Sequence, residues 1–153
     1  GHAHAQNSLG LMYANGVGIP ENDAEAAVLY HMAAVQGLRE AQGNLGYVYS
    51  TGEGVAQSDI TAYVWLSASK INGLRAGKSW LKKLRKRMTK QQIADAQTLA
   101  TQCYESDYKD CDSNRFKSTM TDNRTSGESL LSSLKTMDSS ITSKVHSFWA
   151  IAV

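Results

Sequence analysis

Small and apolar residues recur along the first half of the chain with a period of 36 residues. The pattern AQxxLGxxYxxGxG begins at residue 5 and again at residue 41. Residues 5–40 and 41–76 are identical at 13 of 36 positions, and these identities cluster at small and apolar residues. Self-similarity at a fixed period of this length indicates stacked structural repeats.

Each 36-residue unit is expected to form two antiparallel helices. Ala5, Leu9 and Tyr13 are four residues apart, which places them on one stripe of a helix that faces a neighbour. Gly16 begins the glycine pair that ends this helix, since glycine accepts the positive φ of a helix C-terminus. Gly10 and its repeat Gly46 are expected where a partner helix approaches closely, and Leu9 and Leu45 between helices.

The second helices are predicted over residues 23–35 and 59–71. Asp23 and Asp59 stand where their N-caps would be, followed by alanine, valine and aromatic residues. Leu81 falls 36 residues after Leu45, so the pattern continues in weakened form through residues 76–88. There Trp80, Leu81, Leu84 and Met88 form one apolar stripe, surrounded by lysine and arginine. The segment Thr89-x-x-Gln92 then predicts a capping box that opens another helix.

The repeated pattern, with Asp-x-x-Ala, Trp65 and the pair Ala33-Ala34 in the second half of the units, resembles the Sel1-like repeats. These repeats are related to the tetratricopeptide repeats, and the resemblance covers residues 1–76. Residues 77–111 resemble the segment that follows the last repeat in many bacterial members, most clearly at residues 87–97. Ser69-Lys70 departs from the pair in the first unit.

The resemblance implies an all-α protein, an α-α superhelix of antiparallel helix pairs with a C-terminal helical cap. The expected parts are repeats at 1–36 and 37–72, a partial repeat with the cap at 73–111, and a Ser/Thr-rich tail at 112–153. Gly1 stands on a repeat boundary, so a further repeat upstream is expected in a longer parent protein. The tail is either disordered, an amphipathic helix from Leu130 to Phe148 that docks on the solenoid or a partner, or a read-through extension.

Charge and composition leave the partner class open. The net charge of +2 points neither to nucleic acid nor to an acidic partner for the chain as a whole. The sequence contains no run of roughly 18 apolar residues, so it predicts no membrane-spanning helix. A basic patch has no acid between residues 78 and 90, and it consists of Lys78, Lys82, Lys83, Arg85, Lys86, Arg87 and Lys90. It either contacts nucleic acid or an acidic partner, or it is a solvated cap surface whose lysine stems shield the apolar stripe.

The two cysteines, Cys103 and Cys111, lie where the last predicted helix stops. A chain that turns back there can bring them within disulfide distance, or they are two independent thiols. A disulfide would place the protein in an oxidising compartment, periplasmic or secreted, while free thiols would fit the cytoplasm. Two cysteines cannot complete a zinc site, and no histidine lies near them in sequence.

No catalytic centre is expected. The four histidines do not combine with serine, cysteine or aspartate in a motif that suggests hydrolysis, and no cofactor motif is present. Some cysteine-rich Sel1-like proteins act on β-lactams and carry a cysteine pair in every repeat. Both repeats of this chain lack cysteine, so an enzyme of that type is the least favoured alternative.

The resemblance implies an adaptor that binds a protein or peptide in a concave groove lined by the first helices. Positions that differ between the two units, on the same helices as the packing positions, are the candidate contacts. Tyr47 is the favoured anchor, because a rigid aromatic ring offers much contact area at little entropy cost. The predicted groove residues are His4, Asn7, Leu11, Asn15, Gly43, Tyr47, Thr51, Ser79 and Lys83.

Overall fold

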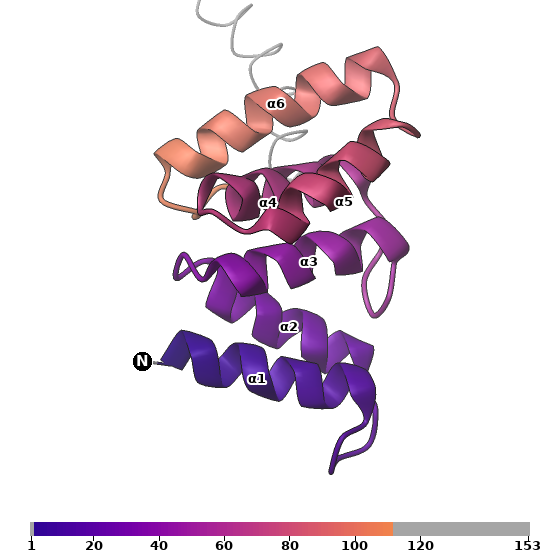
Figure 1. Cartoon of the computed structure of the whole chain (residues 1–153), viewed down its shortest axis with the longest axis vertical. Helices are drawn as coiled ribbons and strands as arrows, with labels where there is room; N and C mark the ends of the chain where they lie inside the picture. The colour runs from indigo at the N-terminus through magenta and orange to yellow at the C-terminus, as the bar shows by residue number, and fades with distance from the viewer. Residues whose placement is uncertain (1, 112–153) are drawn as a thin grey trace, which may run out of the picture. The chain divides into compact units, whose positions relative to one another are not determined.

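The computed structural model describes residues 2–111, which form helices stacked in chain order (Figure 1). The six helices are α1 (His2–Asn15), α2 (Asp23–Ala34), α3 (Arg39–Thr51), α4 (Asp59–Ile71), α5 (Arg75–Arg85) and α6 (Lys90–Glu105). Within residues 2–111 there is no strand, which confirms the predicted all-α class. None of these helices is long and apolar enough to cross a lipid bilayer. The tail predictions for residues 112–153 lie outside the described part of the chain.

Glycines in the first helices let the paired helices approach closely, as the repeat pattern predicts. A Cβ atom on Gly46 of α3 would lie 2.7 Å from Cγ of Leu66 in α4. A Cβ on Gly10 would lie 2.8 Å from the Tyr30 ring of α2. Atoms this close would overlap, so any side chain would push the two helices of a pair apart.

The two equivalent leucines differ in burial, and the prediction for one of them is wrong. Leu45 is 1% exposed, because α3 lies between α2 and α4 and its apolar face is covered. Leu9 is 40% exposed. Its helix, α1, packs on α2, and among the described residues no helix precedes it to cover this face.

The second helices begin where expected, but their caps are one residue earlier than predicted. The side chains of Asn22 and Ser58 accept hydrogen bonds from the backbone N–H groups of Glu25 and Thr61. Asp23 and Asp59 are the first residues inside the helices, where the positive end of the helix dipole interacts favourably with a carboxylate. Asparagine and serine cap a helix as well as aspartate does, so residue type alone does not favour Asp23 and Asp59 over the residues that precede them.

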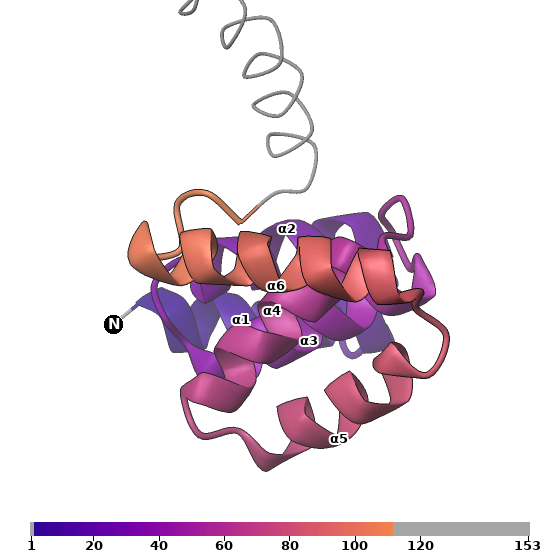
Figure 2. The same cartoon turned by 90° about the horizontal axis from the view of Figure 1, so that it is seen from above.

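Helices α5 and α6 close the stack over α4. Leu81, Leu84 and Met88 pack into one apolar cluster with Ala62, Tyr63, Leu66 and Ala96. The predicted capping box is confirmed, since Thr89 and Gln92 exchange both of its hydrogen bonds at the start of α6. Figure 2 shows α6 crossing α4 while α5 lies to one side. Leu81, Leu84 and Met88 of the predicted apolar stripe therefore belong to the core, whereas Trp80 is 37% exposed.

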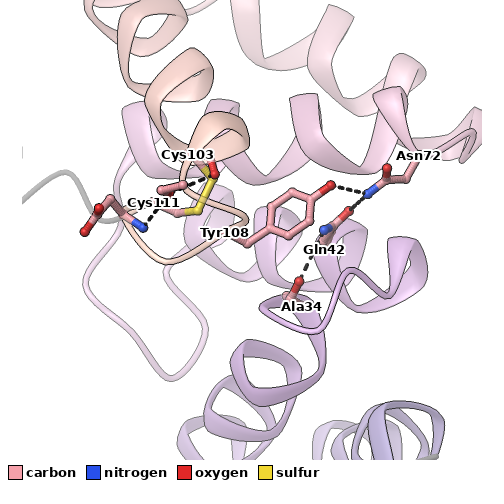
Figure 3. Close-up of a disulfide and its surroundings, with 8 residues drawn as sticks. Ala34, Gln42, Asn72, Cys103, Tyr108 and Cys111 are labelled. Atoms are coloured by element: carbon pink, nitrogen blue, oxygen red, sulfur yellow. Dashed lines mark hydrogen bonds between the residues drawn. A yellow bond between two sulfur atoms is a disulfide. The ribbon is translucent and has the colours of Figure 1, made fainter.

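A disulfide closes the loop after α6. Cys103 and Cys111 are bonded, with their Cα atoms 4.5 Å apart, and both side chains are buried (Figure 3). The chain reverses through Asp107 and Tyr108, which have φ values of 53° and 64°. Non-glycine residues rarely adopt this left-handed region, so the loop must be fixed by its surroundings.

A row of hydrogen bonds runs from this loop into the first repeat (Figure 3). The Asn72 amide donates to the Tyr108 hydroxyl at 2.8 Å and to Oε1 of Gln42 at 2.8 Å. The Gln42 amide donates to the carbonyl oxygen of Ala34 at 3.2 Å. Gln42 is fully buried, so these bonds satisfy polar groups that water cannot reach. The row ties the ends of α2 and α4, and the loop after α6, to α3.

Candidate partner-binding site

A cavity of about 240 Å³ lies between α3 and α5. Four residues of α5 and the turn after it line it, at positions i, i+3, i+4 and i+7 of one helical face. They are Trp80, Lys83, Leu84 and Arg87, and Ser50 of α3 completes the wall. Trp80 is 37% exposed and Leu84 only 4%, so the cavity has a partly open aromatic wall and a buried apolar floor.

Tyr47 and Trp80 form an aromatic pair beside this cavity. Their ring centroids are 5.0 Å apart with the planes at 71°, an edge-to-face arrangement that fixes both rings. The Lys83 ammonium lies over the Trp80 ring, 4.6 Å from its centroid, as in a cation–π interaction. The Tyr47 hydroxyl donates to Glu53 at 3.3 Å. The negative charge of Glu53, followed by burial and the hydrogen bond to Glu53, raises the pKa of the Tyr47 phenol.

Arg87 joins three elements at the far wall of the cavity. Its Nε donates to Asp59 at 3.0 Å, and its terminal nitrogen donates to the same carboxylate and to the Ser50 carbonyl oxygen. Two parallel bonds to one carboxylate fix the guanidinium group and offset its charge. Lys83, in contrast, forms no ion pair within residues 2–111. It is therefore the cation that the cavity presents to a ligand.

The predicted groove residues differ in how open they are. Tyr47 and Gly43 are partly buried and Asn7 is 9% exposed, while the other six are exposed: His4, Leu11, Asn15, Thr51, Ser79 and Lys83. The Asn7 side chain accepts a hydrogen bond from Asn44 at 3.0 Å, which joins α1 to α3. A Cβ on Gly43 would lie 2.8 Å from Leu74. Asn7 and Gly43 thus contact neighbouring parts of the chain.

Trp80 was missed as a site residue, because its sequence position suggested the apolar stripe of the cap. Leu81, Leu84 and Met88 of that stripe are buried, whereas Trp80 turns toward Tyr47. Adjacent helical residues point about 100° apart, so Trp80 stands at the edge of the stripe defined by Leu81. Its position three residues before Lys83, a predicted groove residue, was the signal that could have found it.

The predicted basic patch is exposed along its whole length. Helix α5 and the turn after it contain no acid, and α6 begins with Lys90. Arg87 alone among these seven side chains takes part in an ion pair within residues 2–111. The patch therefore remains a field of positive charge beside the cavity.

Besides Tyr47, two other residues in the described part of the chain, Tyr30 and Glu40, have shifted pKa values. Burial, and then the charge of Asp23, raises the pKa of Tyr30, and a hydrogen bond from Arg39 lowers the pKa of Glu40. The two pKa shifts therefore result from packing around Tyr30 and from the surface ion pair between Arg39 and Glu40. Within residues 2–111 no group of three histidine, cysteine or acidic side chains could hold a metal ion.

The family model of the Sel1 repeat matches residues 3–38 and 39–73. The chain carries two Sel1 repeats. They correspond to the helix pairs α1–α2 and α3–α4, so Tyr47 belongs to the second Sel1 repeat and Trp80 to the helix after it. Sel1 repeats are generally protein-interaction scaffolds.

Among solved structures, one match is the crystal structure of a protective antigen of uropathogenic Escherichia coli that displays an SLR fold. The two proteins are 29% identical, with a TM-score of 0.66 over 69% of this chain. The match spans only 24% of the length of the antigen. No curated protein matches the chain.

Proposed function

We propose that this chain is a non-enzymatic adaptor that binds a peptide or protein segment along the first helices of its repeats, with Tyr47 and Trp80 as anchors. The aromatic pair beside the α3–α5 cavity is the observation that carries the proposal. Both rings stand on helices, and an anchor on a rigid element loses little entropy on binding. Leu11 of α1 and Ser79 and Lys83 of α5, which belong to the predicted groove, are also exposed.

A peptide selection tests this proposal. Random peptides displayed on phage are selected on the purified full chain, and the enriched peptides are then measured against Tyr47→Ala and Trp80→Ala. Loss of an anchor should weaken binding about ten-fold or more. Tyr104→Ala is the matched control, because Tyr104 is an aromatic residue 53% exposed on α6, away from the cavity.

Two results would refute the adaptor proposal. One is that no peptide is enriched over an unrelated helical protein. The other is that enriched peptides bind both anchor variants as tightly as the unchanged chain while the variants keep its melting temperature. An effect of Tyr104→Ala equal to that of Trp80→Ala would likewise place the contact elsewhere.

We also propose that the protein works in an oxidising compartment, periplasmic or extracellular. The disulfide between Cys103 and Cys111 is compatible with such a compartment, since the cytosol keeps most cysteines reduced. Cells expressing the protein are lysed directly into a denaturing solution that contains a thiol-reactive polymer, so that the oxidation state of both cysteines in the cell is trapped. Protection of both cysteines until reduction is expected, and rapid labelling of both would indicate the cytoplasm.

A further inference from the structure

We propose that the α3–α5 cavity takes an apolar side chain flanked by acidic residues, so that the partner is an acidic linear segment of a protein. This inference rests on the adaptor function proposed above and specifies the chemistry of the ligand. It joins two observations, the shape of the cavity and the distribution of charge around it.

Positive charge is concentrated around the cavity although the chain is almost neutral. Residues 60–94 contain nine lysines and arginines and no aspartate or glutamate, while the whole chain has a net charge of +2. This segment supplies α5 and most of α4, including four of the five residues that line the cavity. Such a one-signed field attracts ligands of opposite charge and speeds their association.

The basic side chains of α5 stay open because of how the stack ends. Helix α6 packs on α4, and α5 lies to one side, in contact with α4 and α3 (Figure 2). Lys78, Lys82 and Arg85 are exposed and form no ion pair within residues 2–111. Side chains of both charges would be enough for a helix that only covers the core. In α5 the like-charged side chains repel one another, which lowers the stability of the helix slightly.

The cavity selects an apolar group at its centre and a carboxylate at its rim. Leu84 forms a buried floor and Trp80 a wall, and a volume of about 240 Å³ suits one side chain. Asp59 already offsets the charge of Arg87, so a ligand carboxylate would pair with Lys83. The Lys83 ammonium has three N–H donors, so it can donate to a carboxylate while it stays over the Trp80 ring.

Nucleic acid fits this site less well than a peptide does. Sequence-tolerant binding of single strands depends on bases stacking on open aromatic faces. The Lys83 ammonium lies over one face of the Trp80 ring, and the Tyr47 ring packs against Trp80 with the two ring planes at 71°. The phosphates of a nucleic acid could contact the lysines, but the apolar floor at Leu84 would have no partner.

Fluorescence polarisation with defined probes tests the inference on the full chain. The main probe is a labelled peptide with one phenylalanine between two runs of four glutamates. One matched probe has glutamine in place of every glutamate, and another has serine in place of phenylalanine. A single-stranded oligonucleotide of equal charge is the fourth probe, and all are measured at about 50 and 200 mM salt.

The acidic phenylalanine probe should bind about ten-fold or more tightly than either matched peptide. Trp80→Ala should abolish the preference for phenylalanine over serine, and Lys83→Gln should weaken the acidic probe several-fold. Lys109→Gln is the control, because it removes the same charge from a residue that lines a different cavity, beside the disulfide loop. Its affinity should match that of the unchanged chain.

Three outcomes would overturn the inference. If the glutamine probe binds as tightly as the acidic probe, the partner need not be acidic and the inference is wrong. The adaptor proposal would still stand if that binding depends on Trp80. Equal binding of the serine probe and the oligonucleotide would indicate a non-specific polyanion surface. No binding of the acidic probe, when peptides from the selection do bind, would show that the groove takes a ligand of another chemistry.

Discussion

The close approach at Gly46 offers the sharpest test of how the repeats pack. A Cβ at this position would lie 2.7 Å from Cγ of Leu66, 2.9 Å from its Cδ2 and 3.0 Å from its backbone nitrogen. Leu66 is 1% exposed and cannot turn into solvent without leaving the core. Because one of the three atoms is backbone, relief requires that α3 and α4 move apart.

The expected magnitude follows from two opposing effects of Gly46→Ala. Alanine favours a helix over glycine by about 1 kcal/mol. Overpacking a tight core costs about 1–3 kcal/mol, and contact with backbone places this site at the upper end. The substitution should therefore lower the free energy of unfolding by about 1–2 kcal/mol. Gly46→Leu adds three further carbon atoms in the same place and should cost several kcal/mol.

Denaturant unfolding of the full chain, followed by far-UV circular dichroism, measures these changes. Ser79→Ala is the control for helix propensity, since Ser79 is exposed on α5 and should shift the free energy by less than about 0.5 kcal/mol. A double-mutant cycle with Leu66→Ala isolates the contact. Leu66→Ala alone should cost about 2–5 kcal/mol. Together the two changes should cost less than their sum by about 1–3 kcal/mol.

Additive costs in that cycle would refute the packing argument, because they would show that residue 46 does not meet Leu66. A Gly46→Ala variant more stable than the unchanged chain would do the same, since only the gain in helix propensity would then operate. Rescue should remain incomplete in the double variant, because the backbone nitrogen of Leu66 stays in place.

Four other variants probe the caps and the disulfide loop by thermal melting. Asn22→Ala should destabilise the chain by about 1 kcal/mol and Asp23→Ala by less, and the reverse order would restore the aspartate as the cap. Tyr108→Phe removes the hydroxyl that ends the row of hydrogen bonds, at a cost of about 0.5–1.5 kcal/mol, so an unchanged melting temperature would contradict that role. Reduction, or Cys103→Ser with Cys111→Ser, should cost about 2–3 kcal/mol, and equal melting with and without reductant would argue against a bond in solution.

The sequence alone determined the elements of the stack and their period. Spacing of alanine, leucine and tyrosine at four residues fixes one face of a helix, whatever lies around it. Gly10 and Gly46 could be assigned to close contacts because each follows the leucine of the repeated pattern, and a repeat makes the same contact in each copy. The bond between Cys103 and Cys111 was one of two alternatives, and the structure decided between them.

Tertiary structure decided which of these positions are covered and which are open. Leu9 and Leu45 occupy the same position of the repeated pattern, yet their burial differs because α3 lies between α2 and α4, whereas α1 packs on α2 alone. Trp80 became a candidate anchor because α6 crosses α4 and leaves α5 open beside α3. Local sequence sets the direction of a side chain relative to its own helix, but exposure depends on segments far away in the chain, which no periodic pattern contains.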